Sequence, residues 1–311
     1  MITILMLGGS RRVSLAELFK RSGERIGCEV RFLAYELDTE VPIALVGKVI
    51  KGLKFDDPRV VDDIESVVRD YDVNIILPIV NGAMEVASLL RKRLPNVFIP
   101  VSRFRMTSKL FDKIEAAAEF EKAGLPIPKT YSVIDNEMPV IAKPRKGGSS
   151  RGVRVFHDIS ELMSLPNLNS YILQEYIENA REYTVDCYVS MKGEILVTVP
   201  RERLEVMGGE STRTVTRNIP EIIEMSREVI DKFKLVGPVT IQYLYNPKTD
   251  RYVVMQVNPR LGGGVICSIY AGAPITDYIL KEALGVPVKP CDDWNANVLM
   301  ARYLKEAIFF G

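Results

Sequence analysis

The first hundred residues alternate short apolar runs with longer amphipathic stretches. Apolar, β-rich runs predict strands over residues 2–7, 29–35, 73–79 and 97–100, and helical spacing of apolar positions predicts helices over residues 13–23, 60–70 and 83–90. Strands that are apolar throughout and that alternate with helices pair in parallel, with helices on both faces of the sheet. The pattern therefore predicts an open parallel α/β domain. Ligands of such sheets bind at the carboxyl ends of the strands, where Gly8-Gly9-Ser10 and Asn81-Gly82 occur here.

The pattern changes after Pro100. A helix is expected over residues 108–122, because Gly124 and Pro126 follow as stop signals. Further along, alternation predicts strands over residues 139–144, 152–157, 171–176, 182–189, 195–200, 239–245 and 251–257, with one helix over residues 219–233. The linker at 246–250 has the turn chemistry of a hairpin between the last two strands. This second part of the chain has α+β character.

Composition excludes several classes of function. The chain has 311 residues and a formal net charge of +1, so no global field points to nucleic acid or a membrane. No apolar stretch approaches the length of a membrane span or a signal peptide. The four cysteines form no C-x-x-C pair and His157 is the only histidine, which argues against zinc and against a histidine-activated nucleophile. Reduced cysteines fit a cytoplasmic protein.

The segment 146–152, Lys-Gly-Gly-Ser-Ser-Arg-Gly, lies between two predicted strands. Small residues let backbone N–H groups approach an anion closely, and the flanking cations add charge, so the loop is a candidate phosphate site. A plain hairpin turn is the alternative. Lys143 lies in the apolar strand just before the loop and needs a partner, which a nucleotide phosphate would supply. Its alternative is an edge strand with the lysine in water.

Two more segments carry candidate chemistry. Residues 172–178 are an apolar strand that runs into an acidic turn, which suits an adenine held by backbone groups, and Glu182 follows as a candidate for the ribose hydroxyls. An ordinary edge strand has a similar appearance. Gln256 and Asn258 point to one face of a strand, and Gln242 on the partner strand adds a third oxygen for a hard cation. Arg260 is then placed for phosphate oxygens, although a polar strand end capped by a glycine loop remains the alternative.

Taken together, these segments resemble the ATP-grasp superfamily, and in detail the stand-alone single-module relatives of the carbamoyl phosphate synthase large chain. The resemblance covers essentially the whole chain. It implies a Rossmann-like pre-ATP-grasp domain over residues 1–100, an ATP-grasp small lobe over 101–178 that contains the glycine-rich loop 146–152, and a large lobe over 179–311 with the metal and phosphate site. Residues 200–203 and 207–212 resemble a segment of this subgroup that borders the acceptor site.

The resemblance also assigns roles to single residues. It implies that ATP is bound by Lys113, Lys143, Lys146, Gly147, Gly148, Ser149, Ser150, Glu175, Tyr176, Ile177, Glu182 and Arg260. It implies a metal site of Gln242, Gln256 and Asn258 for Mg²⁺, with Mn²⁺ as an alternative ion, and catalytic roles for Lys143 and Arg260. One departure is important, because the family usually has glutamate where this chain has Gln256. An amide removes a full charge from the metal site, so metal affinity should fall.

The expected function is an ATP- and Mg²⁺-dependent ligase that joins a small carboxylate to an amine, or to a thiol, through an acyl phosphate. Its partners would be small molecules and, by the resemblance, a second copy of the chain. A nucleotide-binding protein of weak activity, impaired at Gln256, is the main alternative. A nicotinamide-dependent oxidoreductase that uses the turn at Gly8 and Gly9 is a third, although G-x-G-x-x-G is missing there. The acceptor stays open, since Arg201, Arg203 and Arg213 would either hold its carboxylate or form surface ion pairs.

Overall fold

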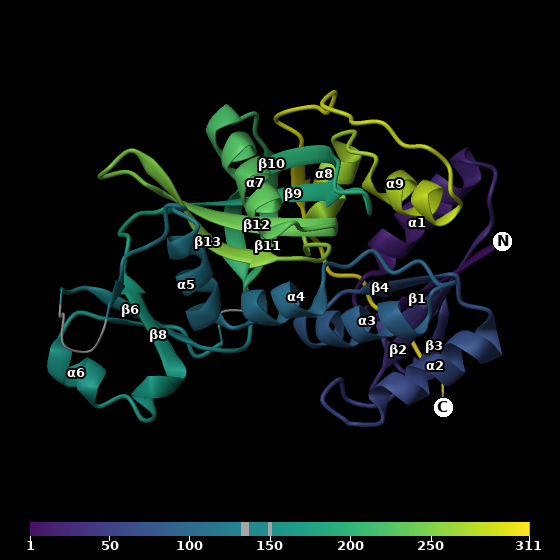
Figure 1. Ribbon diagram of the computed structural model, residues 1–311, viewed down its shortest axis with the longest axis horizontal. Coiled ribbons are helices and arrows are strands. Elements are labelled where there is room, and N and C mark those ends of the chain that lie inside the picture. Colours follow the sequence, from purple (N-terminus) through teal and green to yellow (C-terminus); the bar gives the residue numbers. More distant parts are fainter. Residues whose placement is uncertain (132–136, 149–150, 311) are drawn as a thin grey trace.

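The computed structural model describes residues 1–131, 137–148 and 151–310. Three sheets follow one another along the long axis of the molecule (Figure 1). The amino-terminal sheet lies at one end, a six-stranded sheet lies in the middle, and a small sheet lies at the far end. This order reproduces the predicted sequence of a parallel α/β part followed by antiparallel α+β parts.

The amino-terminal sheet is parallel and has the strand order β3-β2-β1-β4. Its strands are β1 (Ile2–Leu7), β2 (Val30–Glu36), β3 (Lys48–Lys51) and β4 (Ile75–Pro78). Its helices are α1 (Val13–Arg25), α2 (Val60–Tyr71) and α3 (Asn81–Arg93), and a short 3₁₀ turn, η1 (Pro42–Leu45), precedes β3. All six residues of β1 are buried, as expected for a central strand covered on both faces. The predicted strand at 97–100 is reduced to one bridge between Phe98 and Ile75.

The helix expected over residues 108–122 is two helices, α4 (Phe104–Phe111) and α5 (Lys113–Lys122). Asp112 has an extended backbone, with φ −92° and ψ 114°, and its carboxylate accepts the backbone N–H groups of Ile114 at 3.1 Å and Glu115 at 3.4 Å. It therefore caps the second helix and ends the first. The break places Lys113 at the first position of α5, next to the glycine-rich loop.

The small sheet is antiparallel and has the order β5-β8-β6-β7. It comprises β5 (Thr130–Tyr131), β6 (Val140–Pro144), β7 (Arg154–Phe156) and β8 (Tyr171–Glu175), with α6 (Ile159–Met163) and η2 (Leu168–Ser170) between the last two strands. One face packs on α6 around Val140, Phe156 and Leu162. Lys143 lies on the central strand β6 and is buried, so the edge-strand alternative for this lysine is wrong.

The large sheet has the order β13-β12-β9-β10-β11-β14 and is antiparallel throughout. Its strands are β9 (Arg181–Val189), β10 (Ile195–Met207), β11 (Glu210–Thr216), β12 (Gly237–Asn246), β13 (Arg251–Asn258) and β14 (Leu299–Ala301). The expected hairpin of β12 and β13 is present. The strand expected to end at Pro200 continues for seven residues and turns back as β11, because polar side chains on both faces hide this hairpin from a hydrophobic pattern. Helix α7 (Pro220–Phe233) packs on this sheet, and α8 (Val265–Tyr270) and α9 (Ile275–Ala283) follow.

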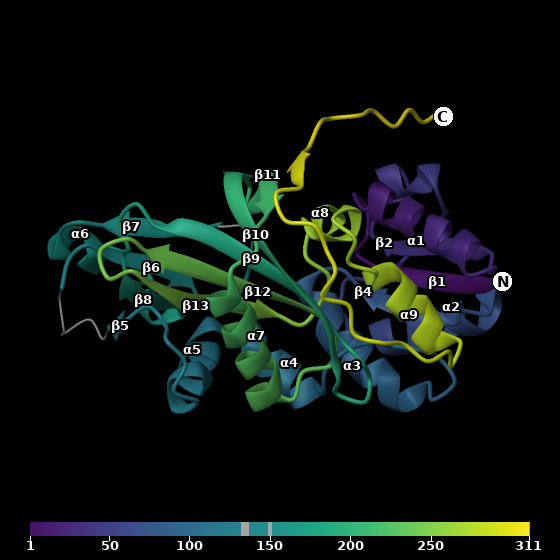
Figure 2. The ribbon, with the colours of Figure 1, turned by 90° about the horizontal axis from the view of Figure 1, so that it is seen from above.

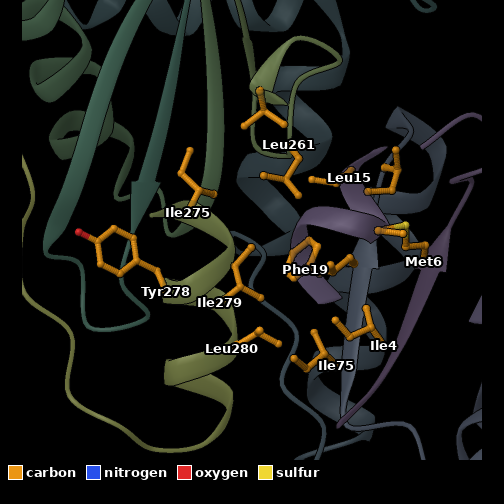
Figure 3. Close-up of a cluster of buried hydrophobic side chains, with 14 of the residues drawn as sticks. Ile4, Met6, Leu15, Phe19, Ile75, Leu261, Ile275, Tyr278, Ile279 and Leu280 are labelled. Atoms are coloured by element: carbon orange, nitrogen blue, oxygen red, sulfur yellow. The ribbon is translucent and has the colours of Figure 1, made fainter. Parts of the chain in front are cut away.

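One hydrophobic core joins the first sheet to the last helices (Figure 3). Ile4 and Met6 of β1, with Phe19 of α1, belong to the same buried cluster as Ile275 and Ile279 of α9. A hydrogen bond of 2.7 Å between the hydroxyls of Ser22 and Thr276 lies in the same contact. This packing fixes the loop after β1 in its position against the large sheet.

After β14 the chain runs out from the body as an extended segment (Figure 2). No helix among the described residues is long and apolar enough to span a membrane.

Candidate functional site

A cavity of about 530 Å³ opens where the three sheets meet. Its walls come from the turn after β1, the start of α3, helix α5, the small sheet and the large sheet. Of the predicted site residues, it is lined by Lys113, Lys143, Lys146, Gly147, Gly148, Glu175, Tyr176, Ile177, Glu182, Gln242, Gln256, Asn258 and Arg260. Ser149 and Ser150 lie outside the described residues. Predicted site residues that are up to 147 positions apart in the sequence, Lys113 and Arg260, therefore share one cavity.

Lys113 and the glycine-rich loop form one corner of the cavity. The amine of Lys113 donates to the carbonyl oxygens of Pro144 and Gly147, each at 3.0 Å. Burial lowers its pKa, and the carboxylate of Asp112 opposes that shift. Gly147 has a φ of 115°, a conformation that side-chain-bearing residues rarely adopt. The lysine thus holds the loop backbone at the place where it turns towards the cavity.

Lys143 is 9% exposed, and its amine donates to the side-chain oxygen of Gln174 at 3.0 Å. Burial and, less strongly, the charge of Lys113 lower its pKa to about 8, and Glu182 opposes both. Two ammonium groups thus influence each other beside one neutral amide. Such a site favours an anion with several charges, since it would relieve both the burial and the repulsion.

The predicted adenine and ribose residues lie on the strand β8 and on β9. The carboxylate of Glu175 accepts the backbone N–H of Lys129 at 3.1 Å, so this side chain ties two strands together while it lines the cavity. Glu182 forms an ion pair of 2.6 Å with Arg203. A ribose that bonds to Glu182 would therefore share it with this arginine.

The three predicted metal ligands line the same wall of the cavity. Gln242 lies directly opposite Gln256 in the β12–β13 pair, and Asn258 is two residues further on the same strand. A bulge leaves Met255 without a partner just before Gln256, and bulges of this kind redirect side chains next to functional sites. All three donors are neutral amides, and among the described residues no group of three or more His, Cys, Asp or Glu could hold a metal ion. The amides fit Mg²⁺ only as additional ligands beside phosphate oxygens.

Arg260 follows β13 and is held on two sides. Its Nε donates to the side-chain oxygen of Asn81 at 2.8 Å, and its Nη1 donates to the carbonyl of Leu261 at 3.0 Å. Burial lowers the pKa of Arg260 to about 10, with Arg12 adding to the shift and Glu210 opposing it. The contact with Asn81 joins the large sheet to the first turn of α3.

The structure shows different environments for the three arginines that the sequence analysis considered as ligands of the acceptor carboxylate. Arg201 and Arg203 of β10 line the cavity, whereas Arg213 forms an exposed ion pair with Glu205. Arg201 is buried on the carboxylate of Asp186, with an Nε–Oδ2 distance of 2.7 Å. Arg203 donates to Ser211 at 3.1 Å and to the carbonyl of Gly209 at 2.9 Å. Of these three arginines, only the two of β10 are therefore candidates for binding an acceptor.

Sequence reasoning missed Arg12 as a site residue, and it gave Glu210 no role of its own, although residues 207–212 were expected to border the acceptor site. They form an ion pair of 2.7 Å between the turn after β1 and the start of β11, and both line the cavity. Burial alone would raise the pKa of Glu210, but Arg12 and Arg302 lower it to about 2. The signal for Arg12 was its position three residues after Gly9, at the carboxyl end of a parallel strand.

A carboxylate of the chain itself lies beside the glycine turn. Burial raises the pKa of Glu36, at the end of β2, to about 7, and the backbone N–H groups of Ser10 and Gly9 oppose that shift. A dinucleotide would need these N–H groups for its pyrophosphate. This arrangement does not favour the oxidoreductase alternative.

Residues 167–305 match a family model described as ATP-grasp in the biosynthetic pathway with Ter operon. The carbamoyl phosphate synthase large chain of Methanobrevibacter smithii is 22% identical over 263 residues, which are 75% of this chain and 25% of that one. Over residues 167–305 the chain is therefore similar to the ATP-grasp family.

Two solved structures show the same fold as this chain. The biotin carboxylase domain dimer of Hydrogenobacter thermophilus 2-oxoglutarate carboxylase, in complex with MgADP, ADP and bicarbonate, superposes with a TM-score of 0.75 at 15% identity, over 96% of this chain and 73% of that one. N5-carboxyaminoimidazole synthetase from Staphylococcus aureus, complexed with ADP, gives 0.73 at 17% identity, over 93% and 79%. These likenesses confirm the predicted fold class.

The chain spans only part of its curated relatives. It covers 38% of the carbamoyl phosphate synthase section from Methanopyrus kandleri and 18% of the large chain from Bifidobacterium adolescentis. The activity of those whole proteins is therefore not transferred to this chain.

Proposed function

We propose that this chain is an ATP-grasp protein, an ATP- and Mg²⁺-dependent ligase that joins a small-molecule carboxylate to an amine, or to a thiol, through an acyl phosphate. The observation that carries the proposal is the meeting of Lys113, Lys143, the glycine-rich loop and Arg260 around one cavity. Four cationic or N–H-rich groups from three separate segments suit a triphosphate better than any smaller anion.

In this proposal the nucleotide lies between the two antiparallel sheets. The triphosphate is bound by Lys113, Lys143, Lys146 and the loop backbone at Gly147 and Gly148. The adenine lies against the backbone of Tyr176 and Ile177. The ribose hydroxyls bond to the carboxylate of Glu182 in place of Arg203. The neighbours that were solved with ADP support the placement, since they share this fold.

The proposed reaction has two steps. An oxygen of the acceptor carboxylate attacks the γ-phosphorus, the bond between the γ-phosphorus and the β,γ-bridging oxygen breaks, and ADP leaves. The amine nitrogen then attacks the acyl carbon, phosphate leaves with the bonding electrons, and the nitrogen loses a proton to solvent. Arg260 stabilises the charge on the transferring phosphoryl group. Such transfer depends on positioning and electrostatics more than on a protein nucleophile, which suits a chain with one histidine.

The metal would be held by Gln242, Gln256 and Asn258 together with phosphate oxygens. Mg²⁺, or Mn²⁺ in its place, neutralises phosphate charge when it is bound. The side chains of this wall orient the polyphosphate from the side opposite Lys143.

A second candidate is a nucleotide-binding protein of weak activity. The neutral amides at the three metal positions, and the lack of an acidic cluster in the described residues, favour it. It differs from the first candidate in one measurable property, because it binds nucleotide without turnover.

The proposal is tested by following ADP and phosphate release while small acids are paired with amines or thiols in the presence of ATP and Mg²⁺. Lys143→Ala should abolish turnover, whereas Lys122→Ala, at the far end of α5, should leave it intact. Turnover that survives Lys143→Ala would mean that the roles assigned here are wrong. A cytoplasmic location and a homodimer, which the resemblance implies, belong to the same proposal and are tested by fractionation and by light scattering.

A further inference from the structure

The charges around the cavity exceed what a nucleotide neutralises. Three glutamates line it, Glu175, Glu182 and Glu210, against eight cations, which are Arg12, Lys113, Lys143, Lys146, Arg151, Arg201, Arg203 and Arg260. A complex of Mg²⁺ with ATP carries about two net negative charges. Even after Asp186 is counted against Arg201, a positive surplus remains for a second ligand.

Three of these cations are arginines whose charges interact with that of Glu210. Arg12 comes from the turn after β1, Arg203 from β10 and Arg260 from the end of β13. Arg203 bonds the residues on both sides of Glu210, and Arg12 bonds Glu210 itself. Arg12 also adds to the lowered pKa of Arg260, so these two guanidinium groups influence each other. Arg302 forms a second ion pair with Glu210, so Glu210 is the shared counter-ion of Arg12 and Arg302 within this arginine cluster.

The contact between Arg12 and Glu210 has the geometry of a fork. Nη2 lies 2.7 Å from Oε1, and Nη1 lies 3.5 Å from Oε2. Guanidinium groups bind carboxylates and phosphates in this two-point manner. The side chain of Glu210 therefore occupies a place that is shaped for an anionic group.

Glu210 lies on a segment that can give up this place. It begins β11 directly after Gly208 and Gly209, which have φ values of 57° and 77°. Met207 at the same turn is 71% exposed. The two glycines allow this turn to rearrange, although the bonds of Arg203 to Gly209 and Ser211 and the ion pair of Arg302 with Glu210 must break for Glu210 to leave.

We propose that Arg12, with Arg203 and Arg260, binds a second anionic group of the acceptor, so that the acceptor is a dicarboxylate or a phosphorylated carboxylate. Glu210 holds the place of that group until the acceptor displaces it. The inference rests on the proposed function: one carboxylate accepts the phosphoryl group near Arg260, and the second anionic group fixes the molecule at Arg12. A doubly anionic acceptor neutralises the positive charge that remains around the cavity after the complex of Mg²⁺ with ATP has bound.

The test measures binding by isothermal titration to the full chain with Mg²⁺ and a non-hydrolysable ATP analogue. The probes are matched pairs that differ by one anionic group: succinate with succinamate, glutarate with glutaramate, glutamate with glutamine, and 3-phosphoglycerate with glycerate. We expect at least one doubly anionic probe to bind about tenfold to a hundredfold tighter than its partner, the range of a charge-assisted hydrogen bond. The pair that shows the preference distinguishes a dicarboxylate from a phosphorylated acid.

Variants then assign the preference to the arginine cluster. Arg12→Gln should abolish it, and Arg11→Gln, at the exposed neighbouring position, should preserve it. Glu210→Gln should tighten binding of the doubly anionic probe several-fold, because the competing carboxylate is gone. Equal binding within every pair, no binding of any doubly anionic probe, or a preference that survives Arg12→Gln would each overturn the inference.

Failure of this inference and failure of the proposed function give different results. Preferential binding without ADP release, whichever amine or thiol is added, contradicts the ligase and leaves the anion subsite standing. ADP release that is equally fast with both members of every pair contradicts the subsite and leaves the ligase standing.

Discussion

Arg201 and Asp186 form a buried, two-point ion pair at the wall of the cavity. Nε lies 2.7 Å from Oδ2, and Nη2 lies 3.2 Å from Oδ1. Both side chains are 2% exposed. Thr214 accepts from Nη1 at 3.1 Å, and Ser268 donates to Oδ2 at 2.6 Å, so the pair is anchored to both a neighbouring strand and α8. The guanidinium of Arg201 is therefore held in one orientation at the wall of the cavity and is not free to turn towards an acceptor.

The first prediction concerns this pair. Asp186→Asn keeps the shape but leaves the guanidinium buried without its counter-ion, which we expect to lower the free energy of unfolding by about 3–5 kcal/mol. Urea denaturation followed by circular dichroism measures the change. Glu205→Gln is the matched control, because it removes the partner of the exposed Arg213 and should change stability little. A loss no larger than that of the control would show that Asp186 does not neutralise Arg201.

The second prediction concerns Gly264, which packs against the same guanidinium. A Cβ at this position would lie 2.4 Å from Nη1 of Arg201, and the backbone φ of −94° is open to alanine, so only the side chain creates the conflict. Because Arg201 is held at both ends of its guanidinium, Gly264→Ala should destabilise the protein by about 1–3 kcal/mol, the usual range for overpacking. Its control is Gly82→Ala in α3, where the new Cβ meets Phe55 at an ordinary 3.4 Å. Thermal unfolding should separate the two variants clearly, and equal melting temperatures would contradict the argument.

The third prediction follows from the pKa of Lys143. Burial, with the charge of Lys113, lowers it to about 8, and Glu182 opposes the shift. If the ammonium form binds a phosphate, affinity for ATP should be constant below pH 8 and should fall by up to about tenfold per pH unit above it. Titrations of ATP between pH 6.5 and 9.5 measure this. Lys143→Met should bind weakly and lose that pH dependence; an unchanged profile in this variant would assign the titration to another group.

The same lysine predicts how stability without nucleotide depends on pH. Between about 8 and the ordinary lysine pKa of 10.5, the unfolded chain binds a proton that the folded chain has lost. Stability contributed by this group therefore rises with pH across that window. The Lys143→Met variant should lack that contribution, which urea denaturation at pH 8 and pH 10 would detect as a smaller difference between the two conditions.

The sequence was sufficient wherever one physical signal decided the structure. The buried run of β1 and the turn chemistry between β12 and β13 were both recognised correctly, because burial on two faces and a hairpin linker leave clear local patterns. The break at Asp112 was missed although its signal was present. Asp112 followed three residues later by Glu115 is a helix-start pattern, and the apolar spacing on either side concealed it.

The acceptor end of the cavity was not predictable in the same way. Arg12 and Glu210 are 198 positions apart, and the local sequence around each residue contains no pattern that predicts contact with the other. Their meeting depends on the packing of α1 against α9, which is a property of the assembled core. The nucleotide residues were found because each segment has its own recognisable chemistry, whereas the arginine cluster exists only as a spatial arrangement.

The last prediction concerns the metal wall and separates the two proposed functions. Gln256 faces Gln242 across the β12–β13 pair, so a carboxylate at position 256 would be placed beside two amide oxygens, Gln242 and Asn258. A carboxylate is the stronger ligand for Mg²⁺, and Gln256→Glu should therefore lower the Mg²⁺ concentration needed for half-maximal nucleotide binding about tenfold. If the natural protein is a nucleotide-binding protein of weak activity, turnover should also rise strongly in this variant. If it is a working ligase, turnover should change little once Mg²⁺ is saturating. Gln256→Met is the control for both readings, because it has a similar size and no charge, and a gain in this variant would show that packing rather than metal binding is responsible.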